Sequence, residues 1–120
     1  MPRIDILAGN AEQTGTVLIQ VKTKRSGTWQ ASVRAGMPRE AVPEEQRFWI
    51  FVDLRENPIE PPAYYIVDEW WTQNDIYVGH QAYLKRADGT RTRSPDSPHH
   101  AIPLSRIMDS KDRWDRLGIL

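Results

Sequence analysis

The sequence predicts one α/β domain with a mixed central β-sheet flanked by helices. Several short segments alternate apolar and polar residues with the period of two that half-buried strands show, and another segment is almost entirely apolar. A longer segment past the middle of the chain has helical spacing and a plausible cap at each end. With 120 residues the chain is long enough for one core and too short for two ordinary domains, so we expect a single domain over residues 1–120.

The first two strands are predicted on either side of a turn at residues 9–15. Apolar and polar residues alternate around Asp5, and they alternate again from residue 17 to residue 22. The segment between them contains Gly and Asn, which favour turns, so an antiparallel hairpin is the simplest arrangement.

The register of this hairpin decides which polar side chains meet. If the turn is centred between residues 12 and 13, paired residue numbers sum to 25. Asp5 then faces Gln20. In the same way, Arg3 faces Lys22. A carboxylate, an amide and an ammonium would cluster on one face, whereas a slip of one residue would send one strand's polar set to the opposite face.

Three further strands follow along the chain. Residues 28–33 alternate and predict a third strand of the same meander, with Trp29 in the core. Residues 36–46 contain two prolines and three glutamates and are expected to form an exposed loop. Residues 48–54 are nearly all apolar, which is typical of a strand buried on both faces, and residues 64–67 predict the next strand.

A long helix is predicted from Glu69 to about Ala87, where it would cover one face of the sheet. Asp68 stands at the N-cap position, and Gly89 is a suitable stop. The apolar stripe expected to face the sheet consists of Trp70, Trp71, Tyr77, Val78 and Leu84. His80 is expected at the boundary of this stripe.

Residues 88–98 are rich in turn formers and predict a loop, whose arginines either grip phosphates or are simply solvated. His99 and His100 come next. Adjacent histidines in a strand point to opposite faces, so we do not expect them to share one metal ion. Either is a candidate for proton transfer if it lies near Asp5.

The chain ends in a segment that predicts a short helix. Either Asp109 or Ser110 is a suitable cap for it. Trp114 and Leu117 would then face the core. The sequence shows no internal repeat, no glycine-rich phosphate loop and no zinc-ligand spacing.

Composition excludes several classes of protein. Sixteen basic and sixteen acidic residues cancel, which argues against a protein that coats DNA through its overall charge. Cysteine is absent, so disulfides, thiolate nucleophiles and cysteine-based zinc sites are excluded. No apolar run approaches the roughly 20 residues of a membrane span, and no secretory leader pattern opens the chain, so we expect a cytoplasmic protein.

The order of an Asp strand followed by a Gln-x-Lys strand resembles the PD-(D/E)XK nuclease superfamily. Asp5, Gln20, Lys22 and Trp29 stand as in small bacterial members with a glutamine variant of the motif. The apolar strand and the one after it are similar to that family's later core strands. The resemblance implies the restriction-endonuclease-like fold, and hence a single nuclease-like domain.

By this resemblance, Asp5 and Gln20 would be metal ligands, and these two residues with Lys22 would form the catalytic set. The resemblance implies hydrolysis of phosphodiester bonds in DNA with Mg²⁺ or Mn²⁺. A divalent ion can supply a nucleophilic water and charge stabilisation, and Mg²⁺ needs only one or two protein carboxylates. A neighbouring lysine can stabilise developing negative charge. The residues expected to contact nucleic acid are Lys24, Arg25, Arg91 and Arg93.

Two departures from the family pattern leave alternatives open. Gln20 supplies a neutral carbonyl where many relatives have a carboxylate, so weaker metal binding is expected. The family usually has a helix before its first strand, often with a glutamate, whereas the first strand here is expected almost at Met1. Either the start is truncated, another chain supplies that helix, or the site is incomplete.

Two other functions therefore compete with an active endonuclease, which we expect to act as a dimer or beside a partner protein. One is an inactive scaffold of the same fold that binds nucleic acid or protein. The other is a small α+β interaction module in which the motif is a coincidence. In the run from Lys22 to Arg25, a solvated strand end is as good an interpretation as a phosphate-binding patch.

Overall fold

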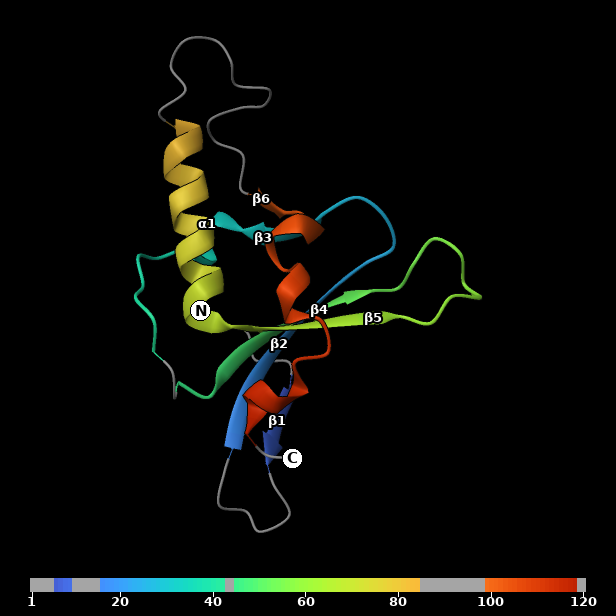
Figure 1. Cartoon of the computed structure of the whole chain (residues 1–120). Helices are drawn as coiled ribbons and strands as arrows, with labels where there is room; N and C mark the ends of the chain where they lie inside the picture. Colours follow the sequence, from blue (N-terminus) through green and yellow to red (C-terminus); the bar gives the residue numbers. More distant parts are fainter. Residues whose placement is uncertain (1–5, 10–15, 43–44, 85–98, 119–120) are drawn as a thin grey trace.

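Two β-sheets and one α-helix make up the part of the chain that the computed structural model describes, residues 6–9, 16–42, 45–84 and 99–118 (Figure 1). The strands are β1 (Ile6–Gly9), β2 (Thr16–Lys24), β3 (Trp29–Ser32), β4 (Arg47–Asp53), β5 (Ala63–Asp68) and β6 (His99–Ile102). The α-helix is α1 (Glu69–Leu84). Four 3₁₀ segments complete the set: η1 (Val33–Ala35), η2 (Leu104–Arg106), η3 (Met108–Ser110) and η4 (Trp114–Leu117).

The main sheet has the strand order β1-β2-β4-β5 and is mixed, as predicted. β2 runs parallel to β4 and antiparallel to β1, while β4 and β5 are antiparallel. β4 lies between two neighbours, and its residues 48–53 are all buried, with none more than 8% exposed. The nearly continuous apolar run therefore marks a strand covered on both faces, as expected.

The predicted hairpin register is confirmed for the described residues. Ile6 pairs with Ile19, and Leu7 pairs with Leu18, so each pair sums to 25. Asp5 and Arg3 lie outside the described residues, so their predicted pairing stays a prediction.

Side-chain alternation divides the main sheet into two faces. We call the first the helix face, because Ile76 of α1 packs there against Trp49 and Phe51 of β4. We call the second the C-terminal face, because Leu117 of η4 packs there against Ile50 and other alternate residues of the sheet. The domain is therefore layered, with α1, the small sheet and Ile107 on one side of the main sheet and η4 on the other (Figure 1).

The prediction that β3 extends the β1–β2 meander is wrong. β3 pairs antiparallel with β6 in a separate two-stranded sheet, with Trp29 opposite Ile102. The chain turns at Gly27, which has a φ of 71°, and β3 then lies over the helix face instead of beside β2. Trp29 is 1% exposed, so its predicted place in the core is confirmed.

The helix begins at Glu69 as predicted, but its buried face differs from the predicted stripe. The buried residues of α1 are Thr72, Asp75, Ile76 and Tyr83. Two members of the predicted stripe, Tyr77 and Val78, are exposed at 37% and 54%. The helix is described to Leu84, and its predicted extension to Ala87 and stop at Gly89 lie outside the described residues.

The last described residues form 3₁₀ turns, not the predicted capped α-helix. η4 begins after Arg113, so neither Asp109 nor Ser110 caps it. Leu117 is buried, and the ring of Trp114 lies 5.5 Å from that of Tyr64, so both residues pack as predicted.

This C-terminal segment also covers the outer edge of β5. Arg116 donates to the backbone oxygen of Ile66 at 2.7 Å, and the backbone N–H of Asp112 donates to Tyr64 at 2.9 Å. These bonds satisfy carbonyls that an edge strand would otherwise leave unpaired.

Candidate functional site

Two of the three predicted catalytic residues lie side by side on the helix face. In the parallel register of β2 and β4, Gln20 pairs with Trp49 and Lys22 pairs with Phe51. Because Trp49 and Phe51 belong to the core on the helix face, Gln20 and Lys22 direct their side chains to that face as well. Both are half-buried, so an amide and an ammonium stand together at the border of the core.

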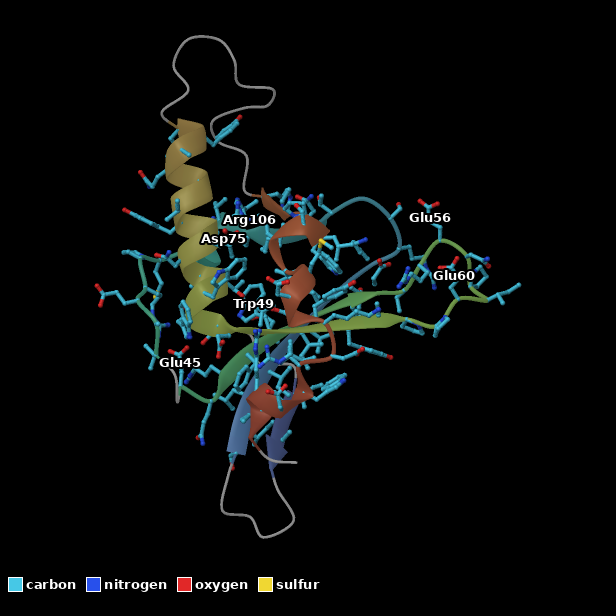
Figure 2. All side chains as sticks on the ribbon, viewed as in Figure 1. Glu45, Trp49, Glu56, Glu60, Asp75 and Arg106 are labelled. Carbon is cyan, nitrogen blue, oxygen red and sulfur yellow. The ribbon has the colours of Figure 1, made fainter. Side chains whose placement is uncertain are left out.

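Lys22 lies over an aromatic ring. Its Nζ is 5.7 Å from the ring centroid of Trp49, within the range of a cation–π interaction. Trp49 is 2% exposed and lies between the main sheet and α1 (Figure 2). Its Nε1 donates to Oε1 of Glu69 at 3.3 Å, and Oε2 of Glu69 lies 3.8 Å from Nη1 of Arg47.

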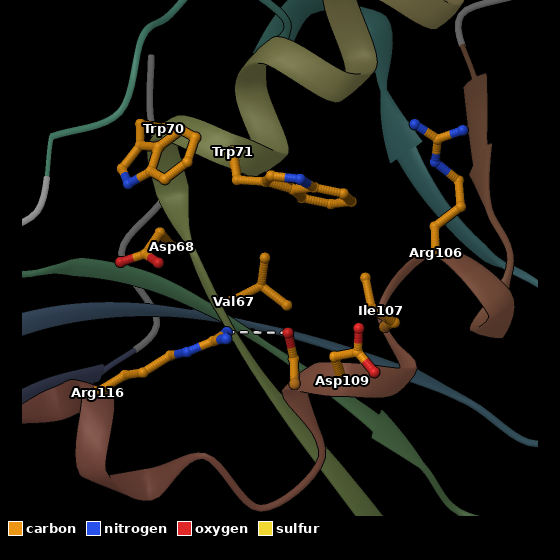
Figure 3. A pocket seen from close by; sticks show the side chains of 9 residues that line it. Val67, Asp68, Trp70, Trp71, Arg106, Ile107, Asp109 and Arg116 are labelled. Atoms are coloured by element: carbon orange, nitrogen blue, oxygen red, sulfur yellow. Dashed lines mark hydrogen bonds between the residues drawn. The ribbon is translucent and has the colours of Figure 1, made fainter.

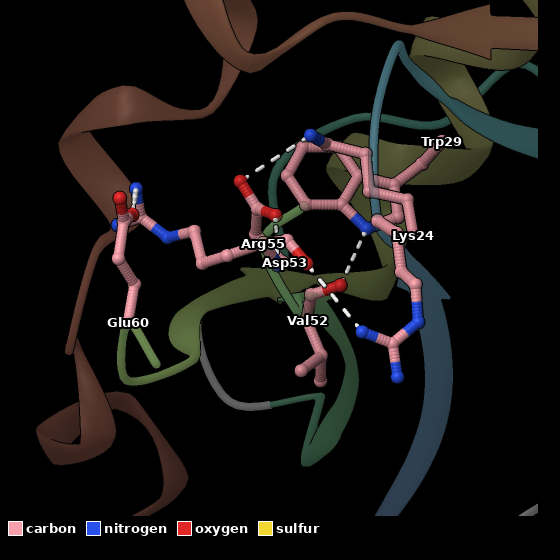
Figure 4. Close-up of polar contacts among 7 residues, drawn as sticks. Lys24, Trp29, Val52, Asp53, Arg55 and Glu60 are labelled. Atoms are coloured by element: carbon pink, nitrogen blue, oxygen red, sulfur yellow. Dashed lines mark hydrogen bonds and ion pairs between the residues drawn. The ribbon is translucent and has the colours of Figure 1, made fainter. Parts of the chain in front are cut away.

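Lys24 has a similar aromatic neighbour but a different electrostatic environment (Figure 4). Its Nζ lies 4.6 Å from the ring centroid of Trp29 and 3.3 Å from Oδ2 of Asp53. The Lys24 side chain is only 11% exposed. Trp29 in turn donates through Nε1 to the backbone oxygen of Val52 at 3.1 Å. Lys24 is therefore packed and paired within the fold. This favours a structural role for Lys24 over the predicted contact with nucleic acid.

Asp53 is ionised more readily than an ordinary aspartate. Burial raises its pKa, but this effect is outweighed by the backbone N–H of Arg55, which donates to Oδ1 at 2.9 Å, and by the ammonium of Lys24. The net result is a pKa below the usual 3.8. The Lys24–Asp53 contact is thus a pair of opposite charges at neutral pH.

The other predicted nucleic-acid contacts are only partly covered by the structure. Arg25 is exposed, and its Nη1 donates to the backbone oxygen of Arg55 at 3.5 Å. Arg91 and Arg93 lie outside the described residues. Of the two interpretations of residues 22–25, the solvated strand end therefore describes Arg25. It does not describe Lys24, which is packed.

Metal binding would need oxygen ligands beyond those the described residues bring together. No group of three or more His, Cys, Asp or Glu side chains suited to a metal ion occurs among them. Gln20 offers one carbonyl oxygen, and Lys22 offers none. Asp53 and Glu69, on the same face, are occupied by Lys24 and Trp49. A fit to Mg²⁺, which needs few protein ligands, therefore depends on the carboxylate of Asp5, outside the described residues.

A polar cluster that the sequence did not predict joins α1 to β6. Asp75, in the middle of the helix, is 6% exposed, and its carboxylate contacts Arg106 through one oxygen and Nε2 of His100 through the other, the latter at 3.3 Å. A Cβ at Gly79 would lie 2.3 Å from Cε1 of His100, so the imidazole occupies space that only glycine leaves open. His100 is half-buried and His99 is exposed.

Gly79 is the sequence signal that could have indicated this cluster, because a glycine inside a helical pattern lowers helix propensity and leaves room for a close neighbour. His100 is bound to Asp75, which favours a structural part for it over the proposed proton transfer at Asp5. A hollow of about 380 Å³ lies beside the cluster, with Tyr83 among its lining residues.

A second hollow, of about 260 Å³, lies between the start of α1 and the C-terminal 3₁₀ segments (Figure 3). Trp70, Trp71 and Arg106 are among its lining residues. Burial raises the pKa of Asp68 at its rim, and the buried Nε1 of Trp70 has no hydrogen-bond partner among the described residues. Arg116 closes one side by donating to Oγ of Ser110 at 2.9 Å.

No protein-family model matches the chain, and no similar sequence was found among curated proteins and no similar fold among solved structures. Within the described residues, no helix has both the length and the apolar character required to cross a bilayer.

Proposed function

We propose that this chain is a metal-dependent endonuclease domain of the restriction-endonuclease-like fold, which hydrolyses phosphodiester bonds in DNA. The observation that carries the proposal is the shared orientation of Gln20 and Lys22 on the helix face of β2. The hairpin register observed for β1 and β2 supports it too, because the same sum of 25 assigns Asp5 as the partner of Gln20.

The sheet also supports the proposal. The motif strand lies inside a mixed sheet, directly beside the apolar strand β4, and the next strand leads into a long helix. This is the order of core elements that the resemblance implies. If the motif were a coincidence in a small interaction module, there would be no reason to expect this particular order of elements around β2.

Each residue of the proposed site has a distinct part in the chemistry. Asp5 and Gln20 would hold a divalent cation, which when bound supplies a nucleophilic water at neutral pH and charge for the phosphoryl oxygens. Lys22 would donate to a non-bridging oxygen of the scissile phosphate and stabilise the negative charge that develops there. Because Lys22 is half-buried beside Trp49, its ammonium acts where water screens charge less than in bulk solvent.

A duplex needs more contact surface than one small domain supplies, so we propose that the endonuclease acts as a dimer or beside a partner protein. Arg25 and the arginines at residues 91 and 93 are the proposed contacts to the phosphate backbone. Their contribution would be local, since the whole chain has no net charge.

The direct test incubates the protein with supercoiled and branched DNA in the presence of Mg²⁺ or Mn²⁺. We expect metal-dependent cleavage, and we expect Lys22→Ala to reduce kcat by on the order of 10²- to 10³-fold, as for loss of one donor to transition-state charge. Lys24→Ala is the matched control, because Lys24 lies on the same strand and face but is paired with Asp53. No cleavage by the wild-type protein, or equal losses in the two variants, would contradict the proposal.

The second candidate function is an inactive scaffold of the same fold that binds nucleic acid or a protein. Two observations favour it: Gln20 contributes no charge to a metal site, and Lys24 is neutralised by Asp53. Titration with Mn²⁺ distinguishes the two functions. An endonuclease should bind the ion in a way that Asp5→Ala abolishes, whereas a scaffold should not.

A further inference from the structure

We infer that Trp49, itself fixed by Glu69, is a positioning residue that sets where the ammonium of Lys22 lies. The inference rests on the proposed function in one respect, namely that the position of Lys22 matters for cleavage. The placement itself is a physical claim that can be measured without any substrate.

The need for a positioning residue follows from the chemistry of lysine. An ammonium on a flexible four-carbon stem can occupy many places, and a group that donates to one phosphoryl oxygen has to be in place beforehand. Among the described residues, no carboxylate forms an ion pair with Lys22. The aromatic face of Trp49, 5.7 Å from Nζ, is the contact available to hold it.

Trp49 is suited to this part because it cannot easily move. Its side chain is 2% exposed, and its ring lies 6.1 Å from that of Phe51 in the core on the helix face. It pairs with Gln20 across the parallel strands, so the same residue lies beside both the amide and the ammonium of the proposed site.

Glu69 fixes the indole at its Nε1 edge. It is the first residue of α1, and its carboxylate accepts from Nε1 of Trp49 at 3.3 Å while lying 3.8 Å from Arg47. A negative acceptor on the indole N–H draws the proton outward and enriches the ring in electrons, which strengthens its attraction for a cation. The helix start is thereby connected to the lysine through one ring.

The chain contains an internal comparison for this claim. Lys24 lies over Trp29 at 4.6 Å, but Asp53 also holds its ammonium. Because Lys24 lies over a different ring, changes at Trp49 and Glu69 should affect Lys22 and leave Lys24 in place. The two lysines can be followed separately, because the sequence has only four: Lys22, Lys24, Lys85 and Lys111.

The experiment labels the folded protein by ¹³C-dimethylation of its lysines, which preserves their positive charge, and records NMR spectra. The Lys22 and Lys24 signals are assigned by Lys22→Arg and Lys24→Arg. In the wild-type protein we expect the Lys22 methyl signal upfield of that of the exposed Lys111, because it lies over the Trp49 ring. Trp49→Leu removes the ring current itself, so it should abolish the upfield shift of Lys22 and assign that shift to Trp49, and it should leave the shift of Lys24, which lies over Trp29, unchanged.

Substitutions at Glu69 test the second half of the inference and do not require a change in the core. Glu69→Ala should reduce the Lys22 shift, and Glu69→Gln, which retains an acceptor for the indole, should restore most of it. If Trp49→Leu fails to fold, the Glu69 pair still decides the matter. A Lys22 signal at the position of Lys111 in the wild-type protein, or one that no Glu69 variant moves, would overturn the inference.

Cleavage provides a separate measurement. With an active enzyme, Glu69→Ala should lower kcat on the order of tenfold with KM little changed, and Glu69→Gln should recover it. An upfield Lys22 signal together with unaltered kcat in Glu69→Ala would overturn the positioning part. A wild-type protein that cleaves nothing refutes the proposed function, while the NMR signals still decide whether Trp49 places the lysine.

Discussion

Two lysines on one strand, two residues apart and on the same face, have different electrostatic environments. Lys24 is held by Asp53 at 3.3 Å and lies over Trp29, whereas Lys22 lies over Trp49 and forms no ion pair with a described carboxylate. Both rings belong to one core. The clearest difference between the two lysines is therefore the charge balance around their ammonium groups.

This difference indicates which lysine can act on a substrate. A lysine whose charge is already balanced by a carboxylate can add stability, but the pair contributes little positive electrostatic potential at the protein surface. An ammonium held by an aromatic ring is placed without being neutralised, so its full charge remains available to an anion. Lys22 is thus the better candidate for contact with a phosphate, and Lys24 the better candidate for holding β2 to β4.

The largest effect on stability should follow from removal of the carboxylate that pairs with Lys24 and not with Lys22. Asp53→Asn preserves size and an acceptor for the Arg55 N–H but removes the charge that holds Lys24. We expect a loss of about 2 kcal/mol in the free energy of unfolding, the range for hydrogen bonds to charged groups. Urea denaturation measures it. Glu60→Gln, which alters an exposed pair with Arg55, is the control and should cost under about 0.5 kcal/mol.

The same pair predicts a pH dependence. The pKa of Asp53 is lower in the folded chain than its ordinary 3.8, so its contribution is fully present above that value. It should be lost as the pH falls through the folded pKa. The stability difference between the wild-type protein and Asp53→Asn should therefore be constant from pH 7 to about pH 5 and shrink below 3.8. A difference that grew on acidification would contradict this assignment.

A smaller effect is expected from giving Lys22 a carboxylate on its own face. Gln20→Glu places a negative charge two residues along the same strand and should tighten Mn²⁺ binding about tenfold, or about 1.4 kcal/mol, because ligand charge raises cation affinity. Calorimetric titration checks it. Gln30→Glu, on the exposed face of β3, is the control and should leave metal binding unchanged.

The smallest effect concerns the salt dependence of DNA binding. If exposed Arg25 contacts a phosphate and paired Lys24 does not, Arg25→Ala should reduce the slope of log affinity against log salt by about 1. Lys24→Ala should leave the slope as it is. Fluorescence anisotropy with a labelled duplex at several salt concentrations measures both, and equal slopes in the two variants would remove the distinction between these residues.

Local patterns predicted five of the six described strands and the helix start, because each depends on nearby residues, whereas β6 was not predicted. Alternation located β2, the apolar run located β4, and the turn length gave the register of β1 with β2. The partner of β3 could not be predicted in this way. Alternation indicates a strand but not its neighbour, and β3 pairs with β6 about 70 residues further along the chain.

The buried face of α1 and the surroundings of the site were predicted less well, for a related reason. A hydrophobic stripe assumes that buried residues are apolar, yet α1 buries Asp75, whose carboxylate contacts Arg106 and His100 from distant parts of the chain. Likewise, nothing local to Lys24 indicates that Asp53 neutralises it. The sequence placed Gln20 and Lys22 on one face, but their electrostatic surroundings depend on long-range contacts.

Gly79 has a consequence for any redesign of this chain. Exchange of a helix-interior glycine for alanine ordinarily stabilises a helix by about 1 kcal/mol. Here the added methyl group would meet the imidazole of His100, so a better helix on its own would be a worse partner for β6. A redesign that places a side chain at position 79 would therefore also have to replace His100 by a smaller residue, which in turn would remove one partner of Asp75.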